Sequence, residues 1–284
     1  MKDRDFFPDR DGIAERHSGI VGGDRAGTFA ALLVVGLLLL LTGVAVVRLE
    51  FSFAGLANGT TQLVTFIGLM FPPDPGGKAI IFLKALGETV AISFLGTLLA
   101  AALAFPLGFL AARGVLGGWL LRALTRRFSD TLRGVDTLIW ALIWINVVGL
   151  GPFAGVLAIM TSDIGAFTKL FSETIEAADP RPSEGVVSTG GTRLHEVRFG
   201  LLPQVLPVFL SQVLYYFESN TRSATIIGIV GAGGIGLHLA EMIRTFEWDR
   251  VSFIILIVLV AVAAIDFIST RIRLAMIGDK ASSK

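Results

Sequence analysis

The sequence predicts an all-α integral membrane protein with six transmembrane helices and a helical loop on one side of the membrane. Of its 284 residues, 53% are hydrophobic and only 17% are charged, and the mean hydropathy of +0.73 exceeds what a soluble domain buries. Several stretches of roughly 20 residues, the length that crosses the hydrocarbon layer, contain no Asp, Glu, Lys or Arg. The absence of cysteine excludes disulfide bonds and thiolate metal sites.

The charge-free stretches locate the spanning helices. They are residues 26–47, 89–112, 137–162, 199–217 and 251–265. The third is interrupted by the sequence GLGP at 149–152, which predicts a tight turn between two helices and brings the count to six. The first stretch is too long for the apolar region of a signal peptide, so we expect a retained helix.

The distribution of basic residues predicts the orientation, because Lys and Arg accumulate on the cytoplasmic side. Three segments on one side of a six-span chain are rich in them, namely the N-terminal tail, residues 113–133 and the C-terminus. Both termini are therefore expected to be cytoplasmic. The predicted parts are a cytoplasmic tail (1–26), the first helix with an external loop (27–83), the transmembrane core (84–275) and a cytoplasmic C-terminal tail (276–284).

A glycine-rich segment follows the fifth predicted helix, and its glycines are Gly231, Gly233, Gly234 and Gly236. Their spacing matches the G-x-G-x-x-G dinucleotide fingerprint, but the βαβ context is missing and the predicted topology places the segment outside the cell. We interpret the glycines as positions of positive φ and close helix approach, in preference to a phosphate-binding nest. The sequence LHLAEMIRTFEW then predicts a short amphipathic helix with Trp248 at the interface.

The least hydrophobic part of the membrane region is the predicted cytoplasmic loop between the fourth and fifth helices. Asp179 and Pro180 form a favourable helix start, and Gly190 with Gly191 ends that helix. Thr192 is expected to cap a second short helix that runs to about residue 199. Two short helices suit the docking of a partner protein, although an ordinary polar loop explains the same residues equally well.

The loop also carries a resemblance to a known family. Glu184, Gly190, Leu202 and Pro203 have the spacing of the EAA loop of ABC importer permeases, from which this chain departs at Gly185, Val186 and Gly200. Together with "IEAADPRPSEG", "TGGTRLHEV", "LLPQVLP" and "ESNTRSAT", the region from about residue 71 to the C-terminus resembles the permease of the phosphonate ABC importer. The segment VGAGGIG is shared with methionine-importer permeases.

The resemblance implies a bacterial inner-membrane subunit with a methionine-importer-like core. It implies a homodimer of permease subunits surrounded by lipid, a cytoplasmic ATPase dimer docked on the 179–200 loop, and an external substrate-binding protein. ATP and Mg²⁺ would be used by the ATPase, while this chain would bind no cofactor, metal or nucleic acid. In agreement, no Walker A motif occurs, since the Gly77-Lys78 pair has Pro72 in place of the first glycine. We therefore expect a transport subunit without catalytic residues.

Two charged residues, Glu218 and Arg222, lie within or at the outer edge of the fifth predicted span. Their i,i+4 spacing allows them to pair on one helix face, and ionisable groups in membranes usually face a protein interior or an aqueous cavity. With Ser219, Asn220 and Ser223, they are candidates for a translocation path in which Arg222 attracts an anion. The competing interpretation is that the two charges neutralise each other and only allow the helix to insert into the membrane.

The sequence thus predicts the permease of an ATP-driven importer for phosphonates or related phosphorus oxyanions. A methionine-type importer permease is the nearest alternative. A self-contained secondary transporter is the rival from another class, and it would more often show an internal repeat. A membrane-embedded enzyme comes third.

Overall fold

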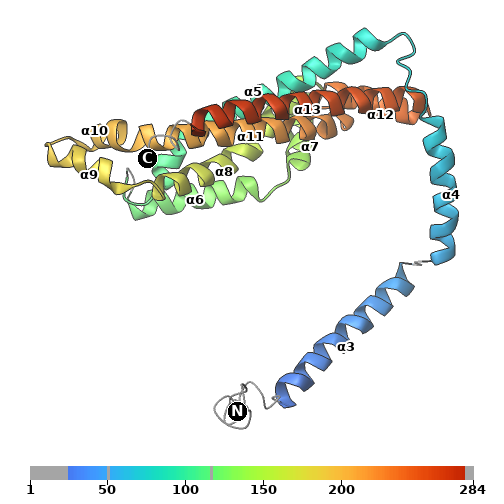
Figure 1. Ribbon diagram of the computed structural model, residues 1–284, viewed down its shortest axis with the longest axis horizontal. Coiled ribbons are helices and arrows are strands. Elements are labelled where there is room, and N and C mark those ends of the chain that lie inside the picture. The colour runs from blue at the N-terminus through green and yellow to red at the C-terminus, as the bar shows by residue number, and fades with distance from the viewer. Residues whose placement is uncertain (1–24, 50–51, 116–117, 279–284) are drawn as a thin grey trace, which may run out of the picture. The chain divides into compact units, whose positions relative to one another are not determined.

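The computed structural model describes residues 25–49, 52–115 and 118–278, and all regular structure in this part of the chain is helical (Figure 1). The predicted tails lie almost entirely outside the described residues. The chain divides into two compact units, residues 1–66 and 67–284. Each unit is described by itself.

The first unit consists of helix α3 (Arg25–Arg48) and most of helix α4 (Phe53–Leu69). Helix α3 agrees with the predicted span at 26–47, and apolar side chains are exposed all around it, as expected for a helix surrounded by lipid. Helix α4 lies within the segment predicted to form an external loop up to residue 83, so part of that segment is helical. Its segment contains no charged residue between 53 and 69, so helix formation leaves no ionisable group exposed to an apolar environment.

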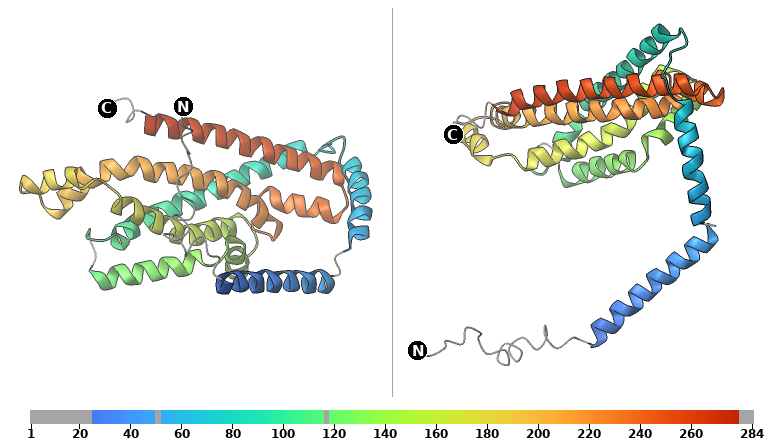
Figure 2. Two further views of the ribbon diagram at one scale, coloured as in Figure 1. Left: turned by 60° about the horizontal axis from the view of Figure 1, so that its bottom comes forward. Right: turned by 45° about the vertical axis from the view of Figure 1, so that its right-hand side comes forward.

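The second unit is a bundle whose long helices are α5 (Ala79–Ala111), α8 (Pro152–Glu176), α11 (Leu202–Ile229) and α13 (Trp248–Gly278). In Figures 1 and 2, α11 and α13 run side by side. Aromatic residues of α8 and α11 form one core cluster, in which the Phe171 and Phe209 rings stack with centroids 4.1 Å apart. A second cluster joins α5, α8 and α11 through Ile92, Ile159 and Ile227.

Two shorter helices, α6 (Trp119–Arg133) and α7 (Thr137–Val148), meet at a bend of 87°. Asp136 caps α7 by accepting a hydrogen bond from the Leu138 amide at 2.8 Å. Among the described residues, five helices are long and apolar enough to span a membrane, or six if this bent pair counts as one span. The predicted turn at 149–152 is confirmed, with φ of 92° at Gly149 and 133° at Gly151, and Pro152 begins α8.

Three spans are longer than predicted because their flanking charges are accommodated within the helices. Helix α5 starts at Ala79 and includes Glu88, whose carboxylate accepts a hydrogen bond from the Gly234 amide at 3.0 Å. Helix α11 continues past the paired Glu218 and Arg222 to Ile229. Helix α13 runs from Trp248 to Gly278. A search for charge-free windows therefore underestimates the length of a helix whose charged side chains form hydrogen bonds or ion pairs within the protein.

Candidate coupling loop and transport site

The first half of the predicted docking loop folds as expected into helix α9 (Pro180–Ser188). The Asp179 carboxylate accepts a hydrogen bond from the Arg181 amide at 3.0 Å, and Pro180 occupies the first turn, where its missing N–H leaves no donor unsatisfied. The helix ends at Ser188, and Gly190 follows with φ of 80°, a backbone angle that favours glycine. Glu184 is exposed on this helix.

The second half of the loop differs from the prediction of a separate short helix. Thr192 does cap α10 (Arg193–His195), with the His195 ring completing a capping box, but a π-helical turn η1 (Glu196–Leu201) then leads directly into α11. A Cβ atom at Gly200 would lie 2.7 Å from the Ser183 Cα atom, so this turn packs closely on α9. That contact explains the glycine at 200, where the EAA pattern has another residue. Leu202 and Pro203 begin α11.

Gln204, which was not among the predicted site residues, holds this loop together. Its side-chain amide donates hydrogen bonds to the carbonyl oxygens of Asp179 at 3.2 Å and Gly200 at 2.6 Å. Its amide oxygen accepts a hydrogen bond from the Asp179 N–H at 3.2 Å. The start of α9 is therefore fixed to the first turn of α11. A lone glutamine beside Pro203 was the only signal in the sequence.

We expect Gln204→Ala to loosen the loop by about 1–3 kcal/mol, since it removes hydrogen bonds of roughly 1 kcal/mol each. The measurement is hydrogen exchange of the amides in residues 177–200, which should become faster. Gln212→Ala is the matched control, because Gln212 on the same helix donates to Thr174 at 3.1 Å and does not contact the loop. Equal exchange rates in the wild type and the Gln204 variant would contradict the prediction.

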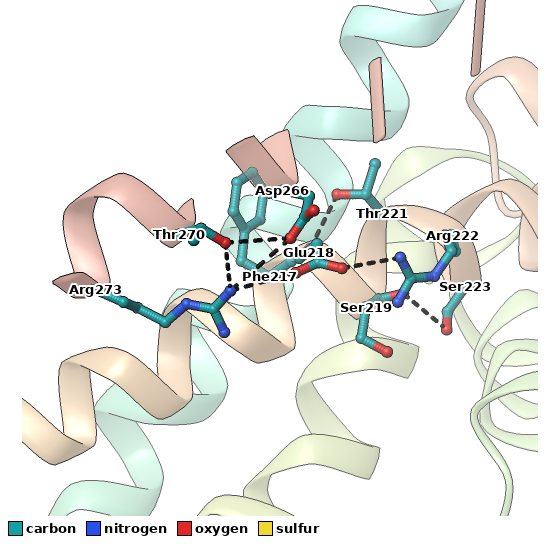
Figure 3. Close-up of polar contacts among 9 residues, drawn as sticks. All are labelled: Phe217, Glu218, Ser219, Thr221, Arg222, Ser223, Asp266, Thr270 and Arg273. Carbon is teal, nitrogen blue, oxygen red and sulfur yellow. Dashed lines mark hydrogen bonds and ion pairs between the residues drawn. The ribbon is translucent and has the colours of Figure 1, made fainter. Parts of the chain in front are cut away.

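The second candidate site surrounds Glu218 on α11 (Figure 3). The Arg222 guanidinium donates to the Glu218 carboxylate at 3.0 Å, so the predicted i,i+4 pair is confirmed. Arg273 on α13 lies 3.9 Å from the other Glu218 oxygen and also 3.9 Å from Asp266. The side chain of Glu218 is only 12% exposed, whereas that of Arg222 is 51% exposed. Glu218 thus orients Arg222, whose guanidinium remains accessible to a ligand.

Of the predicted path residues, Ser219 and Ser223 lie near Arg222 and are half-buried, and the Ser223 hydroxyl donates to the Ser219 carbonyl oxygen at 3.4 Å. Asn220 is separated from this group. It is buried between α5 and α8, and its amide donates to Thr97 at 2.8 Å and to Asp163 at 2.5 Å. Asp163 was not predicted, although a lone acidic residue between two apolar halves of α8 was a visible signal.

Asn220→Leu is expected to destabilise the bundle by about 1–3 kcal/mol, because the buried Asp163 carboxyl group loses its amide donor. The melting temperature of the detergent-solubilised protein would report the loss. Asn146→Leu provides a control of the same chemistry, since Asn146 is exposed on α7 and bonds only to its own helix at Leu142. Similar melting temperatures for the two variants would show that the buried contact contributes nothing.

The glycine-rich segment follows α11 and leads into α12 (Ile235–Arg244), the predicted short amphipathic helix. The predicted positive φ angles are confirmed at Gly231 (106°), Gly233 (84°) and Gly234 (71°). The Gly234 amide is bound by Glu88, and the Ile235 amide donates to the Thr89 hydroxyl at 2.8 Å. Close contact explains Gly236, which packs on Gly228 of α11. The segment is buried against α5, α8 and α11.

Three features together define an integral membrane transport subunit. They are the apolar spanning helices, an accessible arginine held by a partly buried carboxylate, and a capped loop that is continuous with one span. Residues 104–277 match the family described as binding-protein-dependent transport system inner membrane component. The chain belongs to this family.

Individual relatives are more informative than the family model. The chain is 39% identical over 256 residues to a putative phosphite transport system permease protein, HtxC, of Stutzerimonas stutzeri, covering 90% of this chain and 89% of that protein. It is 38% identical over 204 residues to the phosphate-import permease protein PhnE of Mycolicibacterium smegmatis, covering 72% of this chain and 38% of that protein.

A comparison with solved structures gives the fold independently of sequence. An inward-facing structure of the MetNI methionine ABC transporter superposes with a TM-score of 0.62 at 18% identity, covering 70% of this chain and 97% of that chain. The predicted methionine-importer-like core is therefore confirmed at the level of the fold. As the relatives are permease proteins, the prediction of a transport subunit without its own ATP hydrolysis is also confirmed.

Proposed function

We propose that this chain is the permease subunit of an ATP-driven importer for phosphonates, phosphite or a related phosphorus oxyanion. The observation that carries this proposal is the 39% identity to a putative phosphite transport system permease protein, which covers 90% of this chain and 89% of that protein. The second relative is described as a phosphate-import permease. These substrates share a tetrahedral phosphorus centre with anionic oxygens, which is the chemistry that a guanidinium group recognises.

The arrangement around Glu218 supports an anionic substrate. Glu218 and Asp266 balance the charges of Arg222 and Arg273, so the support for an anion comes from the exposure of Arg222 and not from an excess of positive charge. Arg222 is the more exposed of the two, at 51% against 25% for Arg273. A single accessible guanidinium suits a transient contact on a translocation path, because a fully enclosed site would hold the anion too tightly for release.

The proposal includes the partners that the resemblance implies. A second copy of this chain would complete the path, a cytoplasmic ATPase dimer would bind ATP and Mg²⁺, and an external binding protein would deliver the substrate. The loop suits the ATPase contact because α9, α10 and η1 each expose an apolar side chain, namely Val187, Leu194 and Phe199. The proposal also places both termini of the chain on the cytoplasmic side of the inner membrane.

The decisive experiment measures labelled phosphite and phosphonate uptake into proteoliposomes that contain this chain, its ATPase and its binding protein. We expect uptake that requires ATP and all three proteins and that unlabelled phosphonate, but not methionine, inhibits. ATP-dependent uptake of methionine would favour the alternative permease. Uptake without ATP would contradict the proposal and would indicate a secondary transporter.

A further inference from the structure

A cleft of about 430 Å³ lies between helices α6, α8 and α11. Two charged residues of α6 and two of α8 line it, together with one tyrosine of α11; they are Asp130, Arg133, Lys169, Glu173 and Tyr216. Helix α8 is long and apolar enough to cross a membrane. The cleft therefore places four charged side chains along a spanning helix.

These charges lie within the span and are open to their surroundings. Helices α6 and α8 touch near the middle of α8, where a Cβ atom on Gly165 would lie 2.8 Å from the Arg133 amide nitrogen. Lys169 precedes the end of α8 at Glu176 by seven residues, roughly 10 Å along the helix. The four charged side chains are 41–56% exposed. Because charged groups that face lipid are strongly unfavourable, this face must meet water or another protein chain.

The two cations of the cleft are not saturated by their acidic neighbours. The Lys169 ammonium lies 3.6 Å from the Glu173 carboxylate, beyond hydrogen-bond distance. Arg133 binds one Asp130 oxygen through Nε and Nη2, both at 3.1 Å, which leaves its Nη1 group without a partner in the described part of the chain. Both cations can therefore donate to an oxyanion. Since two carboxylates balance their charge, a bound anion would not be held tightly.

A polar face of α11 connects this cleft with Arg222. Tyr216, Ser219 and Ser223 have the spacing i, i+3 and i+7, which places them on one side of the helix, and all three are half-buried. Ser219 and Ser223 lie beside Arg222 (Figure 3), whereas Tyr216 lines the cleft. Hydroxyl groups thus continue from the accessible arginine to the charged residues of α8.

The register of α8 and α11 separates the two cationic positions. The helices are antiparallel, since the end of α8 and the start of α11 both adjoin the α9 loop, and they meet where Asn220 bonds to Asp163. From this contact Arg222 lies two residues away along α11, and Lys169 lies six residues away in the opposite direction along α8. Eight residues correspond to roughly 12 Å. The two cations are therefore successive positions along one helix face.

We propose that this cleft is the inner part of the translocation path, where Arg133 and Lys169 contact the phosphorus oxyanion after it leaves Arg222. The inference rests on the proposed function, in which a second copy of the chain completes the path and the α9 loop is cytoplasmic. It assigns the exposed charged face of α8 to water. This face must then be wet in the assembled transporter.

The first test uses the absence of cysteine from the chain. Ala166→Cys places one thiol in the lining of the cleft, and Leu259→Cys places one at an exposed apolar position of α13. Proteoliposomes that contain the chain and its ATPase are treated on both sides with charged, membrane-impermeant thiosulfonate reagents. We expect the cleft thiol to react at least about tenfold faster, because lipid excludes a charged reagent. Equal rates would overturn the proposal, since a dry face leaves no path.

The same thiol reports the charge of Lys169, which lies three residues from it on one helix face. In Ala166→Cys/Lys169→Gln, the rate with an anionic reagent relative to a cationic one should fall by about threefold or more. Taking this ratio cancels any change in the reactivity of the thiol itself. Lys84→Gln, near the start of α5, is the matched control and should leave the ratio unchanged. An unchanged ratio in the Lys169 variant would also overturn the proposal.

Uptake separates this inference from the proposed function. In a transporter that imports phosphite, Lys169→Gln should lower uptake by about tenfold, the effect of one lost charge-assisted contact, while Lys169→Arg should retain most of it. Normal uptake by a Lys169→Gln variant whose melting temperature shows that it is folded would reject the contact with substrate. A wild-type transporter that imports no phosphite would reject the proposed function, and the thiol labelling would still decide whether the cleft is an aqueous path.

Discussion

Arg222→Gln is expected to reduce phosphite uptake by about ten- to a hundredfold in the reconstituted transporter, because a charge-assisted contact contributes roughly 1.5–3 kcal/mol. Arg222 is the accessible partner of the pair with Glu218, and glutamine retains hydrogen-bonding groups while removing the positive charge. Assembly with the ATPase should be unchanged, since the α9 loop is at the other end of α11. The measurement is initial uptake at several phosphite concentrations, with complex formation followed by size-exclusion chromatography.

Two further variants separate anion binding from mere charge pairing. In Glu218→Gln/Arg222→Gln both charges are removed, so restored uptake would show that Arg222 only neutralises Glu218. Continued loss of uptake would support a requirement for positive charge on the path. Arg127→Gln is the matched control, because its side chain is 86% exposed on α6 and lies outside the Glu218 cluster. Normal uptake by Arg222→Gln would refute the assigned role.

Gly236→Ala is expected to destabilise the bundle by about 3 kcal/mol or more and to lower the yield of folded protein. The added Cβ atom would overlap the Thr225 carbonyl oxygen and lie 2.8 Å from the Gly228 Cα atom. Both contacts are with the backbone, so no side-chain rotation relieves them. The melting temperature in detergent and the monodisperse fraction on size-exclusion chromatography would measure the effect.

Gly87→Ala is the matched control within the same unit. Gly87 lies inside α5, and a Cβ atom there would meet nothing within 4 Å. Alanine is favoured over glycine in a helix interior by roughly 1 kcal/mol, so this variant should be as stable as the wild type or slightly more stable. If both variants melted at the wild-type temperature, the close packing of α12 on α11 would have no energetic importance.

The sequence was sufficient to predict features that depend on residues close together along the chain. The cap at Asp179 and Pro180, the glycine turn at 149–152 and the pair of Glu218 and Arg222 all depend on residues a few positions apart. The positive φ angles of the glycine-rich segment follow from the same kind of reasoning. These features could be predicted because capping, turn formation and i,i+4 pairing involve neighbours along the chain.

Contacts between distant segments could not be predicted in the same way. The partner of Asn220 is Asp163 on another helix, and the partner of Glu88 is the Gly234 amide. Gln204 contacts Asp179 across the loop, which gives it a structural role that its position beside Pro203 did not reveal. Only the packing of the helices assigns these partners, because nothing in a single sequence relates positions so far apart.

The sequence by itself determined that this protein is a helical membrane protein, where its spans begin approximately, and which loop has the composition of a docking element. Hydropathy, charge spacing and helix capping depend on residues near one another in the sequence and on the surrounding solvent, so they can be recognised from the sequence alone. The tertiary structure decided that Asn220 faces Asp163 away from Arg222, and that Lys169 and Tyr216 line one cleft. Side-chain surroundings depend on how helices rotate and cross, and those angles are fixed only when all the helices pack together.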